Sequence, residues 1–266
     1  MLGLGNSIGG YVGGGINLPS DLSGLTNWWR YEHGYRNNAG GLKDVTTSFL
    51  ANDANLGQWD NQINSNHFVQ STTGDQPRFV SADNSVNFKN NAKFFDLSVQ
   101  LDITGDYTIT VFSELDGSLT NRTFFGADAN NDGSADDVIK LVNSTKINFQ
   151  YGSSAISVNG ATTLVADTYY AFTFTRSGDV TSVYIDGALW GSVSEAASTL
   201  TIEHAGSQDP EAQGYKGQWK DVTHYNRALS AGEIADLNIY LHALSLIHIS
   251  EPTRQEAISY AVFCLK

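Results

Sequence analysis

The sequence has almost no cysteine, few basic residues and no long hydrophobic run, and each shortage excludes a class of protein. Its one cysteine, Cys264, cannot form an intrachain disulfide, and a zinc site built on several cysteines is excluded as well. Lys and Arg number 15 against 28 Asp and Glu, which gives a net charge of −13. Nucleic acids and anionic membranes need clustered basic side chains, so we expect neither as a partner. No run is long and apolar enough to predict membrane insertion.

The two ends of the chain differ in composition from its middle. Residues 1–20 are rich in glycine and predict a flexible arm. The start, MLGLGNSIGGYVGGG, lacks the basic and unbroken apolar regions of a signal peptide, so we expect none. Residues 244–266, LSLIHISEPTRQEAISYAVFCLK, resemble the in-frame translation of a sequencing adapter, with both constant parts of the adapter in one frame. We therefore expect a non-native tail over 244–266 and one natural domain over 21–243, which contains no cysteine and hence no thiol nucleophile.

Short strand-like runs, separated by turn residues, fill the middle of the chain. Tyr107–Phe112 and Tyr169–Arg176 alternate large apolar residues with smaller polar ones, which is the period of a β-strand. Thr181–Ile185 is followed by Asp186-Gly187, a pair that predicts a tight hairpin. Many short strands with little helix predict an all-β sandwich, and a jelly roll is the arrangement that stacks two curved antiparallel sheets.

The segment GYKGQWKDVTHYNRALSAGEIADLNIY, residues 214–240, predicts a strand that leads into a helix. The period of two places two sets of side chains on opposite faces of the strand: Trp219, Asp221, Thr223 and Tyr225 on one, and Lys220, Val222 and His224 on the other. Ser230 is then placed to cap a helix, with Glu233 three residues later as its reciprocal partner. We expect the strand to be half buried and the helix to be short.

The wording of this segment resembles the closing strand of laminin-G-like, concanavalin A-like jelly-roll domains. Val183-Tyr-Ile-Asp-Gly187 and Gly57-Gln-Trp-Asp60 are similar to further segments of that family, whereas His224 stands at a position that is usually apolar there. The resemblance implies a two-sheet antiparallel jelly-roll sandwich with a short C-terminal helix. The N-terminal wording MLGLGNSI also resembles structural proteins of marine tailed phages, which implies a virion protein made in the host cytoplasm.

An acidic loop between two predicted strands is a candidate calcium site. Asp128, Asn130 and Asp132 occupy positions 1, 3 and 5 of a calcium loop, with glycine at position 6 and Asp136 at position 9. Position 12 is Ile139, so the bidentate carboxylate of such a loop is missing. A solvated turn explains the same residues, and both interpretations stay open.

Two further candidate sites follow from the resemblance. Hydrolytic members of the fold carry Glu-x-Asp on one strand, followed two or three residues later by a second catalytic Glu. The nearest match is Glu114-Leu-Asp116, which lacks that second Glu and also fits a turn. Carbohydrate binding uses exposed aromatic rings as stacking platforms. Trp190 and Tyr215 are the aromatic residues that the sequence least clearly assigns to the core, so we expect them to touch a ligand if any do.

These observations lead to one expected function and two alternatives. We expect a non-enzymatic virion surface or tail-associated module that binds host-surface carbohydrate, with calcium ordering one loop. The alternatives are a structural decoration or assembly module that contacts neighbouring virion proteins without a ligand, and a glycoside hydrolase of the same fold.

Overall fold

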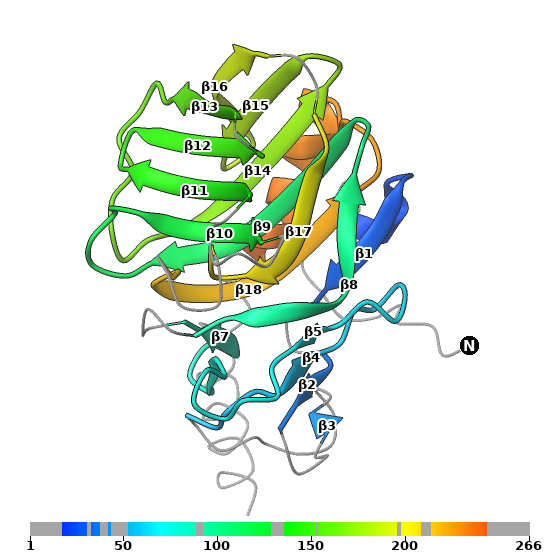
Figure 1. The fold of residues 1–266 in the computed structure, drawn as a ribbon, viewed down its shortest axis with the longest axis vertical. Helices are drawn as coiled ribbons and strands as arrows, with labels where there is room; N and C mark the ends of the chain where they lie inside the picture. Colours follow the sequence, from blue (N-terminus) through cyan, green and yellow to red (C-terminus); the bar gives the residue numbers. More distant parts are fainter. Residues whose placement is uncertain are drawn as a thin grey trace, which may run out of the picture.

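The computed structural model describes residues 18–30, 33–37, 42–43, 53–88, 93–128, 136–152, 154–195, 198–208 and 214–243. These residues form two antiparallel sheets that face each other, with one short helix, so the all-β sandwich predicted from the sequence is confirmed (Figure 1). Most of the Gly-rich arm and all of 244–266 lie outside the described residues.

The first sheet has eight strands, and β18 pairs with three of the others. In spatial order it consists of β16 (Ala188–Ser194), β15 (Val180–Ile185), β14 (Tyr169–Ser177), β9 (Tyr107–Leu115), β18 (Gly217–Tyr225), β7 (Ser85–Asn87) and β6 (Arg78–Val80), while β1 (Leu25–Trp29) pairs with the second half of β18. A short 3-10 helix, η1 (Pro19–Asp21), precedes β1, and the Tyr225 hydroxyl donates a hydrogen bond to its Pro19 carbonyl at 3.0 Å.

The second sheet has ten strands, several of them only two residues long. In spatial order it consists of β13 (Ser154–Asn159), β12 (Lys146–Tyr151), β11 (Asp137–Asn143), β10 (Arg122–Ala127), β17 (Leu200–Ala205), β8 (Phe95–Ile103), β5 (Phe68–Val69), β4 (Gln58–Trp59), β2 (Tyr35–Arg36) and β3 (Leu42–Lys43). The short strands β2 to β5 extend this sheet below the main sandwich (Figure 1).

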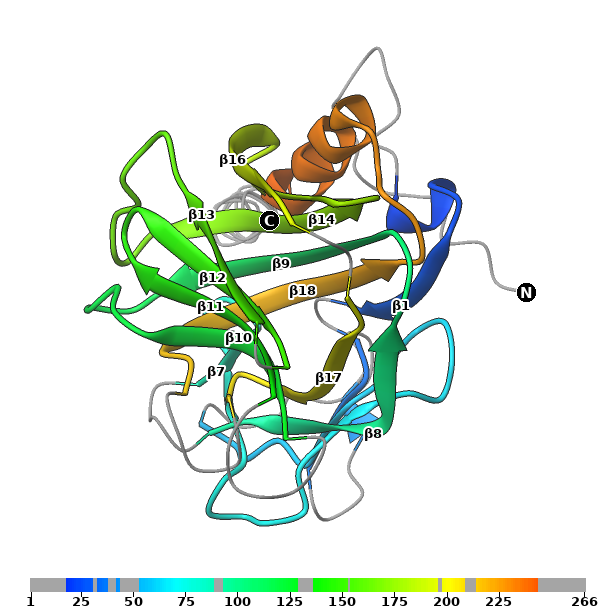
Figure 2. The ribbon, with the colours of Figure 1, turned by 45° about the horizontal axis from the view of Figure 1, so that its top comes forward.

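The protein buries apolar side chains in two places. The larger core lies between the sheets and includes Ile109, Val111, Phe172 and Phe174, which the alternation in β9 and β14 predicted. A helix over 231–243 packs on the outer face of the eight-stranded sheet, where it builds a second core (Figure 2). The second core consists of Trp28, Phe112, Ala171, Tyr225, Leu229, Ile234, Leu237, Tyr240 and Leu241. Both faces of the central strands are therefore covered.

A β-bulge in β18 changes which of its side chains face the sandwich core. The pairing with β9 shifts between Trp219 and Asp221, which adds one residue to β18 at this point. Trp219 and Val222 both lie in the core between the sheets, whereas Tyr225 lies in the outer core beneath the helix. The expectation that Trp219 and Tyr225 share one face is thus wrong, because the extra residue inverts the alternation. The strand is also buried on both faces rather than half buried.

The predicted hairpin and the predicted helix cap are both confirmed. Asp186 and Gly187 link β15 to β16 with φ values of 50° and 78°, the left-handed conformation that a two-residue hairpin of this type requires. At the helix start the Glu233 carboxylate accepts a hydrogen bond from the Ser230 amide at 2.8 Å, and the Glu233 amide donates to the Ser230 hydroxyl at 3.3 Å. A hydrogen bond from Arg227, followed by the Ser230 amide, lowers the pKa of Glu233 to about 2.

Replacing Ser230 with alanine should lower the free energy of unfolding by about 1 kcal/mol, since the Glu233 amide then loses its capping acceptor. Urea unfolding at pH 7 measures this loss. Ser192→Ala, at an exposed position of β16, is the matched control. An equal loss in the two variants would show that the cap contributes nothing.

Candidate functional site

A polar groove opens where the end of β18 approaches the turn between β8 and β9. It encloses about 650 Å³. Three segments form it: residues 64–66 between β4 and β5, residues 99–106 from β8 to the start of β9, and the adjoining parts of β1 and β18. We call it the amide groove, because Asn27, Asn64, Asn66, Gln100 and Asn226 all line it.

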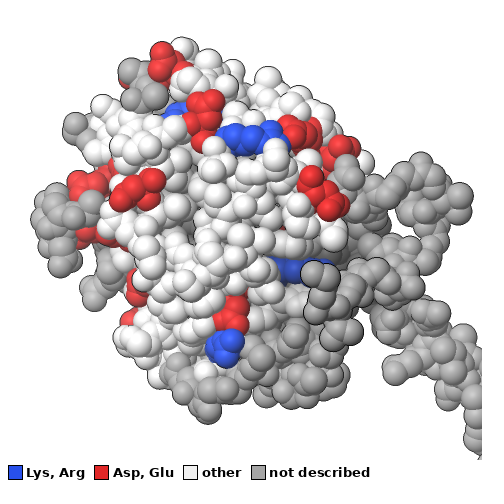
Figure 3. Space-filling view, turned by 90° about the vertical axis from the view of Figure 1, so that its right-hand side faces the viewer, with Lys and Arg blue, Asp and Glu red and all other residues white. Residues whose placement is uncertain are grey.

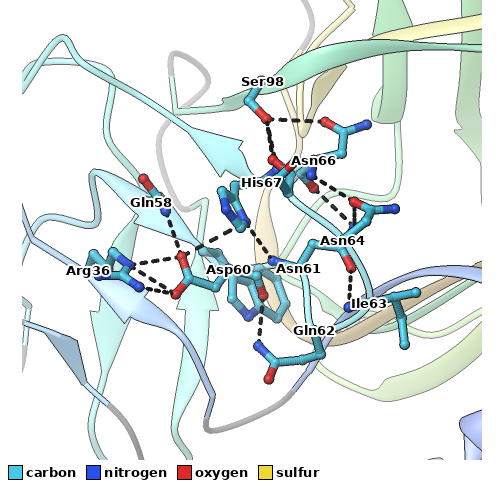
Figure 4. Close-up of polar contacts among 12 residues, drawn as sticks. Arg36, Gln58, Asp60, Asn61, Gln62, Ile63, Asn64, Asn66, His67 and Ser98 are labelled. Atoms are coloured by element: carbon cyan, nitrogen blue, oxygen red, sulfur yellow. Dashed lines mark hydrogen bonds and ion pairs between the residues drawn. The ribbon is translucent and has the colours of Figure 1, made fainter.

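The loop that forms one wall of the groove is held by a charged anchor at its base. Asp60 follows β4 and accepts hydrogen bonds from Arg36 Nε and Nη2, at 2.9 and 2.6 Å, and from Gln58 Nε2 at 2.6 Å (Figure 4). This pairing raises the pKa of Arg36, chiefly through the hydrogen bond to Asp60. At the next residue, the backbone N–H of Asn61 donates to His67 Nδ1 at 3.0 Å, which closes the loop on itself (Figure 4).

Asparagine side chains then fix the loop to both neighbouring strands. The buried Asn61 accepts the Trp28 amide at 3.0 Å and donates to Asn27 Oδ1 at 2.7 Å, which fastens the loop to β1. Asn64 Nδ2 donates to the Thr26 carbonyl at 2.7 Å. On the other side, Asn66 Oδ1 accepts the Val99 amide of β8 at 3.0 Å. The wall is therefore set in place before any ligand arrives.

The floor of the groove contains a buried imidazole. His224 Nδ1 shares hydrogen bonds with the Thr26 hydroxyl at 2.6 Å and with Asn27 Nδ2 at 3.1 Å. Its other ring nitrogen, Nε2, is buried without a hydrogen-bond partner, beside an otherwise apolar cavity of about 10 Å³ that Val222 also lines. Burial lowers the pKa of His224 to about 4. The floor is thus neutral at physiological pH.

The rim of the groove carries groups that remain available to a ligand. Gln100, Asp102, Thr104, Asp106 and Asn226 are all exposed. Together they offer amide donors, carbonyl and carboxylate acceptors and a hydroxyl, the groups that recognise polyhydroxylated molecules. The arrangement can bind and orient such a ligand through hydrogen bonds.

Comparison with known proteins identifies the family. The family model described as the concanavalin A-like lectin/glucanases superfamily matches residues 81–235, which is more than half of the chain. The chain belongs to the concanavalin A-like lectin/glucanase superfamily. A search of curated proteins by sequence finds no match.

A solved sialidase structure shows the same fold at low sequence identity. A Trypanosoma rangeli sialidase is similar with a TM-score of 0.56 and 13% identity, over 84% of this chain and 34% of the sialidase chain. Domain 4 of AbnA, an arabinanase from Geobacillus stearothermophilus, has a TM-score of 0.44 and 15% identity, over 80% of this chain and 98% of that domain. The chain spans about a third of the sialidase's length, and the likeness shows the fold alone.

The two aromatic residues that the sequence least clearly assigned to the core, Trp190 and Tyr215, are buried. Trp190 is 3% exposed and donates from Nε1 to the Thr162 carbonyl at 2.9 Å. Its ring lies so close to Gly160 that a Cβ there would approach it to 1.8 Å. Tyr215 is fully buried, and its hydroxyl donates to Ser113 Oγ at 2.9 Å. Both rings fill the sandwich core, and neither presents a face to a ligand in this structure.

The expected calcium loop is only partly described. Asn130 and Asp132 lie outside the described residues. Asp128 and Asp136 stand at the ends of the neighbouring strands, and the Asp128 amide donates to Glu203 Oε2 at 3.0 Å. Within the described part of the chain, no group of three His, Cys, Asp or Glu side chains could hold a metal ion. The described residues do not form a calcium site by themselves, so calcium stays a prediction.

The carboxylates of the hydrolase alternative lie apart from the amide groove. Glu114 sits in β9 and accepts a hydrogen bond from Gln218 Nε2 at 2.8 Å, while Asp116 follows the end of the strand. Neither lines the groove.

Among the described segments, no helix is long and apolar enough to cross a membrane.

Sequence reasoning missed the amide groove, although a signal was present. Residues 61–66 read Asn-Gln-Ile-Asn-Ser-Asn, a density of amides that a simple loop does not need. Asparagine side chains readily fold back onto nearby backbone groups, so such a run is typical of a shaped loop. The groove's other half, at 99–106, has no pattern that would link it to this loop before the chain is folded.

Proposed function

We propose that the protein is a non-enzymatic carbohydrate-binding module, carried on the surface or tail of a phage virion, that attaches to host-surface glycans through the amide groove. The observation that carries the proposal is the groove itself, which is formed in the free protein and rimmed by exposed amides and carboxylates. Membership of a superfamily of lectins and glucanases supports the ligand class. The N-terminal likeness to phage structural proteins supports the location.

The groove suits weak and reversible attachment. It is open, and among the described residues that line it there is no Trp, Tyr or Phe ring on which a sugar could stack. Each hydrogen bond to a sugar hydroxyl replaces one to water and contributes about 1 kcal/mol. Affinity for a single site would therefore be low, and many copies on one virion would raise the overall avidity.

Replacing Gln100 and Asn226 together with alanine should weaken glycan binding by roughly tenfold, because two hydrogen-bonding groups leave the rim. Both side chains are exposed, so the fold should tolerate the change. A glycan array identifies a ligand first, and titration calorimetry with that ligand then compares the variants. Asn159→Ala, at an exposed site on β13 outside the groove, is the matched control.

Three outcomes would count against parts of the proposal. Equal binding by the groove variant and the control would place the ligand elsewhere. Release of reducing sugar from a bound glycan would overturn the non-enzymatic assignment. Binding unchanged after chelation would contradict the expectation that calcium at Asp128, Asn130, Asp132 and Asp136 orders a loop for binding.

A location on the virion needs its own test. Antibody labelling of purified phage particles should detect the protein on the surface or tail. Its absence from purified particles would refute this part of the proposal and leave the binding activity untouched.

A further inference from the structure

We infer that the amide groove selects neutral glycans with adjacent hydroxyl groups and rejects acidic sugars. This inference rests on the proposed carbohydrate-binding function and concerns the same site. Its basis is the charge of the groove, which contains two carboxylates, Asp102 and Asp106, and no Lys or Arg among its lining residues.

Two basic side chains that adjoin groove-lining residues already have other partners. Arg176 lies beneath the turn between β8 and β9, is 2% exposed and donates to the Ile103 and Gly105 carbonyls. Arg227, next to Asn226 in the chain, forms an ion pair with Glu233 at 2.6 Å. Neither cation is therefore available to compensate the charge of an acidic sugar in the groove.

The surface around the groove has the same bias. Figure 3 shows the side on which β1 and β8 lie in Figure 1, and basic side chains appear there only as a few small patches, while acidic ones are more numerous. The whole chain carries a net charge of −13. An acidic polysaccharide would thus meet repulsion during its approach as well as in the groove.

The two carboxylates are well suited to hydroxyl recognition. Asp106 Oδ1 accepts the Gly178 amide at 2.8 Å, and Asp102 Oδ1 accepts hydrogen bonds from Gln100 Nε2 at 2.8 Å and from the Thr201 hydroxyl at 3.1 Å. These bonds fix each carboxylate through one oxygen, and among the described residues no group donates a hydrogen bond to Oδ2 of either. Those oxygens can accept hydrogen bonds from adjacent sugar hydroxyls, and charge-assisted bonds of this kind are stronger than neutral ones.

One apolar side chain completes the chemical match. Val99 lines the groove and is 61% exposed. The C–H face of a neutral sugar ring can cover it and remove apolar surface from water. A sulfate or carboxylate at the same place would lose hydration without gaining a partner.

The test compares matched ligands on one protein. An array presents neutral oligoglucosides beside oligoglucuronides of the same linkage and length. The wild-type protein should bind the neutral member at least about tenfold more tightly, since two like charges within a few ångströms repel by this order. In a double variant, Asp102→Asn with Asp106→Asn, the preference should fall several-fold, because the amides keep their acceptor oxygens and lose their charge. Glu195→Gln changes the charge by the same amount per residue at an exposed site outside the groove and should leave the preference unchanged.

The outcomes separate the inference from the function on which it rests. Binding to no glycan on a full array would refute both. Equal or tighter binding of the acidic member would overturn the selectivity and leave carbohydrate binding intact. A change in preference by Glu195→Gln that is half as large as the change by the double variant, in proportion to the charge removed, would show that net charge, and not the groove, sets it. The urea unfolding midpoint of each variant confirms that the fold is retained.

Discussion

Replacing Trp219 with alanine should lower the free energy of unfolding by about 4 kcal/mol, one of the largest losses that a single substitution can cause in this protein. Trp219 is fully buried in the core between the two sheets. Its ring centroid lies 4.8 Å from that of Phe88, 5.3 Å from that of Tyr215 and 5.5 Å from that of Phe125. The substitution removes apolar surface from the core and leaves a cavity that these rings cannot fill.

Trp219→Phe separates the cavity from the loss of the indole. Because phenylalanine keeps a large aromatic ring in the core, it leaves a smaller void than alanine, so its cost should be clearly below that of alanine. Urea unfolding followed by circular dichroism measures both variants. Leu189→Ala, at a residue that is 56% exposed, should change stability by less than about 0.5 kcal/mol. A cost for Trp219→Ala as small as that of Leu189→Ala would contradict the assigned core position.

Local patterns predicted the elements of the fold well, because neighbouring residues determine them. The Asp186-Gly187 hairpin and the Ser230–Glu233 cap depend on interactions within a few residues, and both are present. The bulge in β18 could not be predicted in this way. It depends on how β18 pairs with β9, a strand about one hundred residues earlier, and nothing in the local alternation marks the extra residue.

The candidate site depended still more on distant contacts. The exposure of Trp190 could not be judged from its own strand, because its ring is covered by packing against Gly160, which directly follows β13 of the other sheet. The amide groove unites side chains from β1, the loop before β5, the turn after β8 and the end of β18. The run of amides at 61–66 signals a shaped loop, but only the antiparallel pairing of β1 with β18 brings Asn27 beside His224.

Acid should destabilise the protein between about pH 6.5 and pH 4 through His224. Burial lowers the pKa of this imidazole from its ordinary 6.5 to about 4 in the folded protein, so over this range the unfolded chain binds more protons than the folded one. Stability that is fully present above pH 6.5 is then lost as the pH falls, at up to about 1.4 kcal/mol per pH unit and about 3 kcal/mol in total. The stability that the Glu233 carboxylate contributes is lost at lower pH, between about 4.5 and 2, because folding lowers its pKa from an ordinary 4.5 to about 2.

Urea unfolding at pH 7, 6, 5 and 4, with His224→Leu as the variant, tests this assignment. The leucine variant cannot titrate, so its stability should be nearly flat across the range. Its stability at pH 7 is not diagnostic, because Thr26 and Asn27 lose a partner when the imidazole is removed. The slope of the free energy of unfolding against pH shows whether His224 causes the loss. An equally steep loss in the wild-type protein and in His224→Leu would exclude His224 as the cause, because the variant has no imidazole at this position to protonate. A flat variant would show that a histidine at the floor of the amide groove makes the fold sensitive to acid.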